Sequence, residues 1–256
     1  KRAGSNLVYS TMIGKDSFAE IARASFGENG ISMDYVFETE KAATGAALIS
    51  VDEVTSQNEI IVILGASATY EEEDLEKLKE ALSGCEYLLL QMEINREATE
   101  RLISMAYDMG IRVILNPAPA AKVPLDIIEK VTYLTPNEHE AVLIFGEEET
   151  TEELLKKYPE KLVITQGSRG VSVCRKNGEV LTVPARPAIV ADTTGAGDTL
   201  NGAFSVQIAK GEPIAEALRY ANTAASLSTE KFGAQGGMPT AEEVERELKR
   251  NEEKIG

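Results

Sequence analysis

The sequence predicts an α/β protein in which a mostly parallel sheet lies between layers of helices. From about residue 71 onward, segments with helical periodicity alternate with short β-rich segments, as in proteins with parallel sheets. The β-rich segments, such as 87–93 and 111–116, are apolar on consecutive positions, which is typical of strands covered by helices on both faces. Since the sequence contains no internal repeat and no low-complexity linker, residues 1–256 are predicted to form one domain.

The N-terminal part departs from this alternation. Residues 7–14 are predicted to be a buried strand, and Ser17 and Glu20 have the spacing of a capping box for a helix that ends near residues 27–30. Residues 44–64 contain two β-rich segments joined by a polar connection, which predicts a β-hairpin. We expect this small hairpin to stand apart from the main sheet.

The alternating part supplies the sheet and its helices. Asn95 and Gly110 have the chemistry of an N-cap and of a C-terminal helix stop, and Asn177-Gly178 predicts a second hairpin. The predicted helices are 75–82, 95–109, 125–131, 137–145, 151–158, 198–209, 213–228 and 241–250, and the predicted strands are 87–93, 111–116, 132–136, 161–166 and the two arms of 171–183.

The charge of the chain restricts its partners. The formal net charge is −16, which argues against nucleic acid or an anionic membrane as the main partner. A small anionic ligand stays possible, because a local pocket can be positive inside a negative molecule. No apolar run approaches the roughly 20 residues needed to span a bilayer, and no signal peptide opens the sequence. We therefore expect a cytoplasmic protein.

Five loops that follow predicted strands are rich in polar residues and glycine. Ligands of open α/β sheets bind beyond the carboxyl ends of the strands, so these loops are expected to meet at one edge of the sheet. The loops are 91–93, 116–120, 137–140, 165–170 and 192–198.

The last of these loops, DTTGAGD at 192–198, opens a predicted helix. Its small residues let backbone amides approach a ligand, and the free N–H groups and positive dipole end of a helix suit phosphate. The same field is expected to favour the ionised form of Asp198, which could then accept a hydroxyl proton. The alternative is that Asp198 only caps the helix, and spacing alone leaves both interpretations open. The nucleotide motifs GxxxxGK[ST] and GxGxxG are absent from the sequence.

DTTGAGD resembles the signature of the PfkB carbohydrate kinase family. Further segments are similar to those of the ribokinase branch and occur in the family's order over nearly the whole chain: LLLQME at 88–93, LNPAPA at 115–120, TPNEHE at 135–140, ITQGSRG at 164–170 and FGAQ at 232–235. The resemblance implies a three-layer ribokinase-like fold with a hairpin lid near 44–64. It also implies an enzyme that transfers the γ-phosphoryl group of MgATP to O5 of D-ribose.

The resemblance assigns roles to the polar loop residues. Asp198 would be the general base, and the amides of Ala196, Gly197 and Asp198 would form the anion hole, in keeping with the demands of phosphoryl transfer. Glu93, with Asp198, would bind the sugar, and Glu140 would hold Mg²⁺ through water. The residues implied to bind ATP are Asn137, Thr165, Gln166, Gly167, Ser168, Arg169, Gly170, Gly197 and Asn222.

Two more expectations rest on the resemblance. A K⁺ ion, which prefers oxygen ligands, would be held by Asp192, Thr194, Ser228, Lys231, Gly233 and Gly237, mostly through carbonyl groups. The lids of two chains would pair to give a homodimer.

The sequence departs from the family pattern at its start. The NxD strand and the GGKGAN sugar loop of the family are not in this sequence, and the first match is at 3–18. We expect either a fragment or a sequence that omits upstream residues. Two alternatives to a ribose kinase stay open. The first is a kinase for another substrate, such as fructose, a deoxysugar acid or a nucleoside, and the second is a truncated, catalytically silent nucleotide-binding protein.

Overall fold

A sheet of six strands runs through the centre of the protein. The computed structural model describes residues 1–51 and 58–255. Strands β5, β6 and β7 are parallel, single bridges at Leu134–Leu162 and Asn137–Thr165 continue the parallel order to β8, and β9 and β10 follow as antiparallel neighbours. The strands are β5 (Tyr87–Leu90), β6 (Arg112–Leu115), β7 (Tyr133–Leu134), β8 (Val163–Thr165), β9 (Val171–Cys174) and β10 (Val180–Val183).

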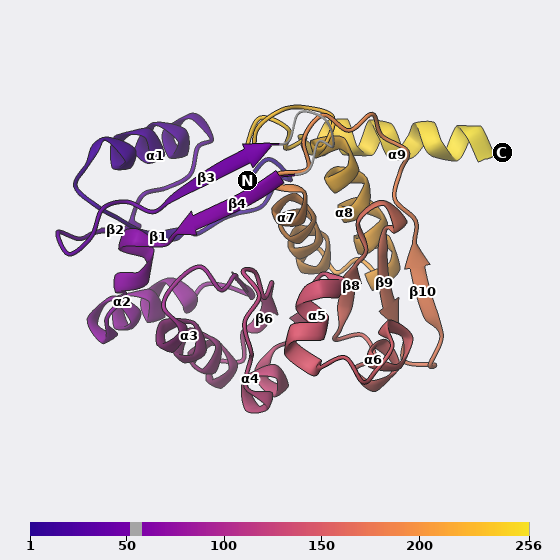
Figure 1. Ribbon diagram of the computed structural model, residues 1–256, viewed down its shortest axis with the longest axis horizontal. Helices are drawn as coiled ribbons and strands as arrows, with labels where there is room; N and C mark the ends of the chain where they lie inside the picture. The colour runs from indigo at the N-terminus through magenta and orange to yellow at the C-terminus, as the bar shows by residue number, and fades with distance from the viewer. Residues whose placement is uncertain (52–57, 256) are drawn as a thin grey trace.

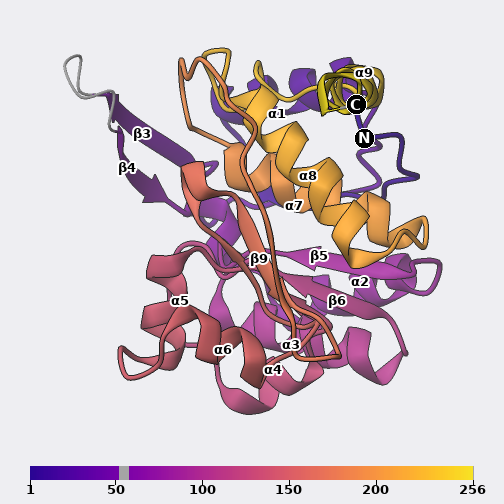
Figure 2. The same cartoon turned by 90° about the vertical axis from the view of Figure 1, so that its right-hand side faces the viewer.

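Helices cover both faces of this sheet, which confirms the predicted α/β class (Figures 1 and 2). One layer holds α2 (Glu72–Leu82), α3 (Arg96–Asp108), α4 (Leu125–Lys130), α5 (Glu138–Phe145) and α6 (Thr151–Lys157), and the other holds α7 (Ala196–Ala209), α8 (Ile214–Ser228) and α9 (Ala241–Ile255). Consecutive residues of strand β6 are apolar because they face helical layers on opposite sides of the sheet. Val113 and Leu115 pack in the core of the first layer, and Ile114 packs in that of the second.

Helix α7 is fixed firmly against the sheet. Phe204 is fully buried, and its ring meets Tyr133 of β7 edge to face, with the ring centroids 5.2 Å apart. Such aromatic pairs add about 0.5–1.5 kcal/mol beyond the burial of their apolar area. The position of the α7 N-terminus is therefore set by packing about two turns further along the same helix.

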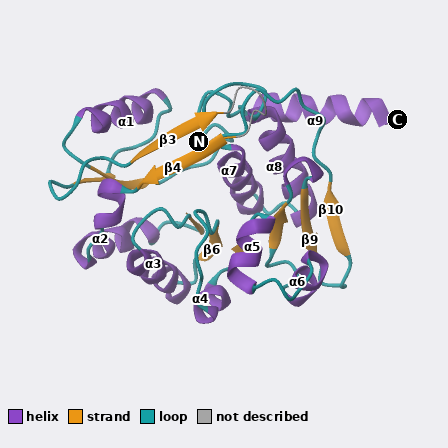
Figure 3. Cartoon of the chain, in the orientation of Figure 1, coloured by secondary structure: helices purple, strands orange, loops and turns teal. Residues whose placement is uncertain are grey.

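The N-terminal elements lie beside the central sheet. Strand β1 (Ser10–Ile13) pairs in parallel with β2 (Tyr35–Glu38), and α1 (Ser17–Glu28) connects them. Strands β3 (Ala46–Val51) and β4 (Asn58–Ile63) form the predicted antiparallel hairpin, which projects from the molecule in Figure 2. The connection predicted between its arms lies outside the described residues. Figure 3 shows how far this strand pair lies from the strands of the main sheet.

Three local predictions need correction. Asp16, not Ser17, caps α1, because its carboxylate accepts a 2.9 Å hydrogen bond from the Ala19 amide. Asn95 precedes α3 without capping it, since its side-chain amide donates to the Tyr70 carbonyl. The strand expected at 7–14 is shorter, and covers only Ser10–Ile13. The two caps differ from the prediction because a neighbouring residue caps α1 and because a tertiary contact engages the side chain of Asn95.

Within the described ranges, no helix combines the length and apolar character required to cross a membrane.

Candidate functional site

The polar loops predicted to meet at one edge of the sheet do so around a cavity. Its volume of about 160 Å³ is well above the roughly 10–15 Å³ that one water molecule requires, so it can admit part of a larger ligand. Strands β5 to β8 present their carboxyl ends to it, and α7 begins beside it. The lining residues are Gln91, Glu93, Asn116, Ala118, Thr135, Asn137, Glu140, Thr165, Gly197, Asp198 and Asn201.

The first turn of α7 supplies unpaired amides to this cavity. Gly195, the residue before the helix, has φ 78°, and a Cβ atom there would lie 2.7 Å from the Ala234 carbonyl oxygen, so only glycine fits. The Ala196 amide donates a 3.2 Å bond to the Thr193 carbonyl. Among the described residues, the amides of Gly197 and Asp198 have no acceptor. These two N–H groups, with the helix dipole, create a site for negative charge.

Asp198 is not a helix cap. The helix begins two residues earlier than predicted, at Ala196, and no side chain caps it. The carboxyl group opens onto the cavity, and Gln91 Nε2 donates a long, 3.5 Å hydrogen bond to it. Enclosure by protein on its other sides raises the pKa of Asp198, and the bond from Gln91 opposes this rise. Burial therefore acts against the helix field, which favours the ionised carboxylate. The raised pKa makes Asp198 a stronger base for a hydroxyl proton.

Glu93 lies at the end of β5 and opens onto the same cavity. Burial raises the pKa of its carboxyl group, and the negative charge of Asp198 raises it further. Two carboxyl groups that share one partly enclosed space each disfavour ionisation of the other. This pair can accept hydrogen bonds from the hydroxyl groups of a ligand, and such bonds would compensate for the repulsion.

Asn137 and Glu140 form a capping box at the start of α5. The Asn137 side chain accepts from the Glu140 amide at 2.8 Å, and Glu140 Oε2 accepts from the Asn137 amide at 2.7 Å. Burial raises the pKa of Glu140, and the Asn137 amide acts in the opposite direction. This box holds one carboxylate at the wall of the cavity.

The oxygen groups at the cavity suit a hard cation, such as Mg²⁺, that is held mainly by substrate phosphates and water. Within the described residues, no group of three His, Cys, Asp or Glu side chains could bind a metal ion by itself. Mg²⁺ commonly keeps several waters and relies on one or two carboxylates plus substrate phosphates. Glu140, at the wall of the cavity, fits that arrangement as a partner of metal-bound water.

The predicted nucleotide segment lies next to the capping box. Thr165 lines the cavity and bridges to Asn137, and Gly167–Arg169 form a short 3₁₀ turn after β8. The Gln166 side chain accepts a 2.6 Å bond from the Ser172 hydroxyl, and Arg169 forms an ion pair with Glu138. Gly167 and Ser168 are exposed, whereas Gly170 is buried at the start of β9. The segment thus offers a short open turn at the edge of the cavity.

Asn222 of α8 is buried and already engaged. Its side-chain amide donates to the carbonyl groups of Pro184 at 2.7 Å and Val183 at 3.3 Å, where β10 ends. It does not line the cavity, so the structure does not bring it together with Asp198 and Glu93.

The residues predicted to bind a monovalent cation lie on two loops that are joined to each other. The Asp192 carboxylate accepts the amides of Thr194 and Gly233, both at 2.9 Å, and these bonds hold the pKa of Asp192 below its usual value. A Cβ atom on Gly237 would lie 2.1 Å from the Ser228 carbonyl oxygen, so the two backbones touch. The backbones around Asp192, Gly233, Ser228 and Gly237 therefore lie close together.

Lys231, from the same predicted set, is exposed. Its ammonium group lies 3.9 Å from the Glu243 carboxylate of α9. Only its backbone carbonyl could therefore serve a cation.

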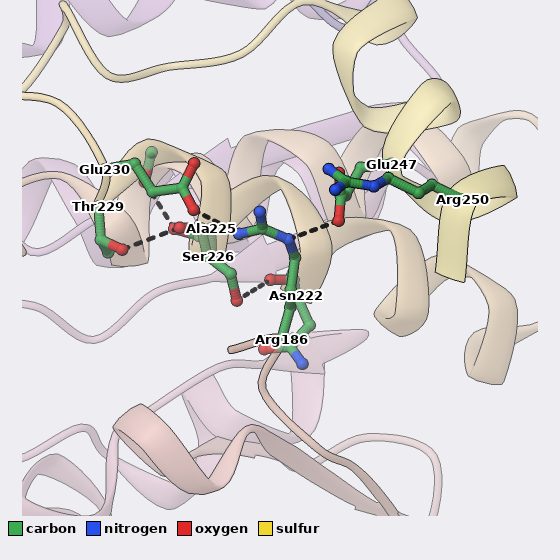
Figure 4. Close-up of polar contacts among 9 residues, drawn as sticks. Arg186, Asn222, Ala225, Ser226, Thr229, Glu230, Glu247 and Arg250 are labelled. Atoms are coloured by element: carbon green, nitrogen blue, oxygen red, sulfur yellow. Dashed lines mark hydrogen bonds and ion pairs between the residues drawn. The ribbon is translucent and has the colours of Figure 1, made fainter. Parts of the chain in front are cut away.

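An ion triad fastens the segment between β10 and α7 to the turn after α8 and to α9. Figure 4 shows the Arg186 guanidinium between Glu230, at 2.7 Å, and Glu247 of α9, at 2.8 Å. The Arg186 and Glu247 side chains are only 16% and 13% exposed, so solvent screens this pair less than a surface pair. The amides of Ala191 and Asp192 also donate to the Thr229 carbonyl. The triad thus supports the junction between the loop of Asp192 and the loop of Gly233.

Sequence reasoning assigned no role to several residues at the cavity. Gln91, Asn116, Thr135 and Asn201 line it, and the last three are less than a tenth exposed. Their signal was present in the sequence, as polar residues at the ends of apolar strands and within an apolar helix. The cross-element partners of these side chains could not be deduced without the structure.

Comparison with known proteins shows which family the chain resembles. Residues 1–241 match the family model described as pfkB family carbohydrate kinase. The chain is 40% identical over 247 residues to ribokinase of Bacillus subtilis, covering 96% of this chain and 83% of that protein. It is 41% identical over 238 residues to ribokinase of Lactococcus lactis, covering 93% and 77% of the two chains.

Solved structures are similar as well. The fold matches ribokinase of Thermotoga maritima with a TM-score of 0.83 and 34% identity, covering 94% of this chain and 80% of that one. It also matches Arabidopsis thaliana ribokinase complexed with ribose and ATP, with a TM-score of 0.81 and 27% identity, covering 93% and 80% of the two chains.

Proposed function

The chain belongs to the pfkB family of carbohydrate kinases, and we propose that it is a ribose kinase that transfers the γ-phosphoryl group of ATP to O5 of D-ribose. The observation that carries this proposal is the juxtaposition of Asp198 with the unpaired amides of Gly197 and Asp198 at one cavity. A base for a hydroxyl proton and donors for a phosphoryl oxygen are the two components that such a transfer requires. The ribokinases that resemble this chain over most of its length support ribose as the sugar.

The proposed reaction uses the residues in fixed roles. Asp198 accepts the proton of the 5-hydroxyl group as O5 forms its bond to the γ-phosphorus and the bond to the ADP oxygen breaks. The amides of Gly197 and Asp198 donate to the transferring phosphoryl group, joined by Ala196 if its weak bond to Thr193 opens. Glu93 accepts hydrogen bonds from sugar hydroxyls. Mg²⁺, when bound with ATP, would supply positive charge to the phosphates, and Glu140 would bind water on the metal.

The nucleotide would extend from the cavity over the turn after β8. Thr165 and the backbone of residues 166–170 would lie along the phosphates and ribose of ATP. Asn222 would lie close to the adenine, where its amide already secures the end of β10. The exposed glycine backbone of the turn permits close approach to a ligand.

The identity of the sugar is tested with a panel of substrates. ADP release is measured with ribose, 2-deoxyribose, fructose and a nucleoside at equal concentrations. The proposal expects ribose to give the highest kcat/KM. Turnover with fructose or the nucleoside and none with ribose would assign another substrate, and ATP binding without any turnover would favour the silent alternative.

Asp198→Asn is expected to lower kcat by about 10²–10⁴-fold, the usual contribution of a general base, while ATP binding measured by calorimetry changes little. The matched control is Asp108→Asn, the same change at the exposed C-terminal end of α3, which should leave kcat unaltered. Substantial residual turnover in Asp198→Asn would refute the role of base.

The same variant is expected to be at least as thermally stable as the wild type at pH 7. Because the folded-state pKa of Asp198 is raised, its contribution to stability is present below its unfolded-state pKa and is lost as the pH rises through the folded-state pKa. At neutral pH the ionised group therefore opposes folding, and asparagine removes that charge. A melting temperature clearly below that of the wild type at pH 7, with no such loss in Asp108→Asn, would contradict this explanation.

The pH dependence of kcat/KM for ribose is expected to show an acid limb, since Asp198 must be ionised to accept the proton. The hydrogen bond from Gln91 favours the ionised form, so Gln91→Leu should raise the pKa of Asp198 further and move this limb to higher pH. The profile is measured with saturating ATP. A limb that stays in place or moves to lower pH would show that Gln91 does not act on the base.

We also propose that a monovalent cation such as K⁺ binds between the loops of Asp192 and Gly233. Because Gly195 lies close to Ala234, a cation that orders these two loops would also fix the first turn of α7. At constant ionic strength, kcat should be severalfold higher in potassium chloride than in tetramethylammonium chloride. Asp192→Ala, which loses the bonds to Thr194 and Gly233, should need more K⁺ for half-maximal activity. Equal activity in both salts would reject the cation.

We further propose that the β3–β4 hairpin is a lid inserted in a single α/β domain, and that two lids pair in a homodimer. Both faces of the hairpin expose apolar side chains, with Leu48, Ile61 and Ile63 on one and Ile49 and Val62 on the other. A two-stranded sheet with two apolar faces is rarely left uncovered by itself in water. One face would cover the sugar, and the other would meet the second lid.

Ile61→Glu charges the face of Leu48 and Ile63, and Ile49→Glu charges the opposite face. One of these variants is expected to shift the protein from dimer to monomer in sedimentation and the other to raise the KM for ribose, because each charge opposes burial of its own face of the hairpin. The matched control is Leu125→Glu on α4, an equally exposed leucine outside the hairpin. A wild-type protein that sediments as a monomer at micromolar concentration would reject the homodimer.

A further inference from the structure

A chain of buried polar side chains lies beneath the first turn of α7. Asn201, 2% exposed, donates from Nδ2 to the Gly197 carbonyl at 2.9 Å, and its Oδ1 lies 2.6 Å from the hydroxyl of Thr135. Thr135, 1% exposed, follows β7, and its carbonyl accepts from Asn116 Nδ2 at 3.1 Å. All three side chains border the cavity. The chain therefore links the ends of two strands with the start of the helix.

The direction of these hydrogen bonds is determined by their chemistry. The Gly197 carbonyl can only accept, so the side-chain nitrogen of Asn201 must face it, and the side-chain oxygen must face Thr135. Thr135 then has to donate its single hydroxyl proton to Asn201. The Leu115 carbonyl, 3.3 Å from the same hydroxyl, competes less well for that proton.

The bond to Gly197 has a consequence for the catalytic turn. The Gly197 carbonyl and the Asp198 N–H belong to the same planar peptide group, so fixing one fixes the direction of the other. That N–H has no acceptor among the described residues, and Asp198 lines the cavity. The Asp198 side chain is attached to the Cα atom that directly follows this amide nitrogen. One buried side-chain amide thus adds to the helical backbone in holding both an anion donor and the base.

We propose that Asn201 and Thr135 are positioning residues for phosphoryl transfer, which hold the Gly197–Asp198 peptide in its catalytic orientation. The inference rests on the proposed kinase function and extends it to two side chains to which that function assigned no role. Thr135 anchors Asn201 to the sheet edge, and Asn201 transmits this anchor to the peptide. The stabilisation concerns charge that develops during transfer, so it should affect kcat rather than substrate binding.

The test compares three variants with the wild type. Asn201→Ala should lower kcat by about tenfold to a hundredfold, because an anion donor is misdirected but not removed. Thr135→Val should lower kcat less, by about fivefold to twentyfold, since the bond between Asn201 and Gly197 remains. The KM values for ribose and ATP should stay within about threefold of the wild type in both. The double variant should resemble Asn201→Ala alone, because both changes break one chain.

A conservative variant and a matched control separate positioning from general stability. Thr135→Ser keeps the hydroxyl group and should restore most of the kcat lost in Thr135→Val. Thr223→Val removes an equally buried hydroxyl that bonds to the Arg219 carbonyl on α8, away from the cavity, and should lower the melting temperature while kcat is unchanged. If Asn201→Ala fails to fold, Thr135→Val and Asn201→Asp, which keeps an acceptor for Thr135 but loses the donor to Gly197, carry the test.

The outcomes are distinguishable. If the wild type shows no kinase turnover, the proposed function fails, and this inference fails with it. If the wild type is active but Thr135→Val and Asn201→Asp lose only stability, as Thr223→Val does, these residues are structural and the inference alone is overturned.

Discussion

The chemistry of this protein depends on one junction, where the N-terminus of α7 meets the carboxyl edge of the sheet. Gly195 makes the junction possible, because its φ of 78° and its approach to Ala234 leave no room for a side chain. Phe204, packed on Tyr133, fixes the helix behind that turn. The free amides of the first turn cannot pair inside the helix, and they cannot move away from the cavity because the helix is buried. Local geometry thus creates an anion site, and tertiary packing holds it in place.

The carboxyl groups at the cavity repel one another when they are ionised. Asp198, Glu93 and Glu140 all open onto it, and each has a raised pKa. Three carboxyl groups would repel a triphosphate if nothing compensated for them. In the proposed reaction, the amides of α7 and a hydrated divalent cation would provide positive charge at the point of transfer, whereas the net charge of −16 is spread over the whole chain. Whether this acidic protein binds an anionic substrate therefore depends on the groups within a few ångströms of that substrate, and not on its net charge.

The parts of the structure that were predictable from the sequence are those set by local pattern and by topology. Consecutive apolar residues identified β5 and β6 as strands covered on both faces, and the rule for open sheets brought their polar ends together. Competition between forces was harder to predict. The sequence suggested that the helix dipole would favour ionised Asp198, but it did not show the opposing effect, that enclosure by protein raises the pKa. The strength of desolvation depends on neighbours distant in sequence, which only the folded structure identifies.

The same limit explains why Asn201 was missed. In the sequence it is one polar residue within an apolar helix, and nothing nearby shows that Thr135, 66 positions earlier, would donate to it. A buried amide that lacked this partner would destabilise the helix, so its presence in the core already implies a partner somewhere. The partner lies at the edge of the sheet and the second bond goes to Gly197, so the requirement to satisfy a buried polar group is met beside the cavity. The hydrogen bonds that stabilise α7 on the sheet are then the same bonds that orient its first turn.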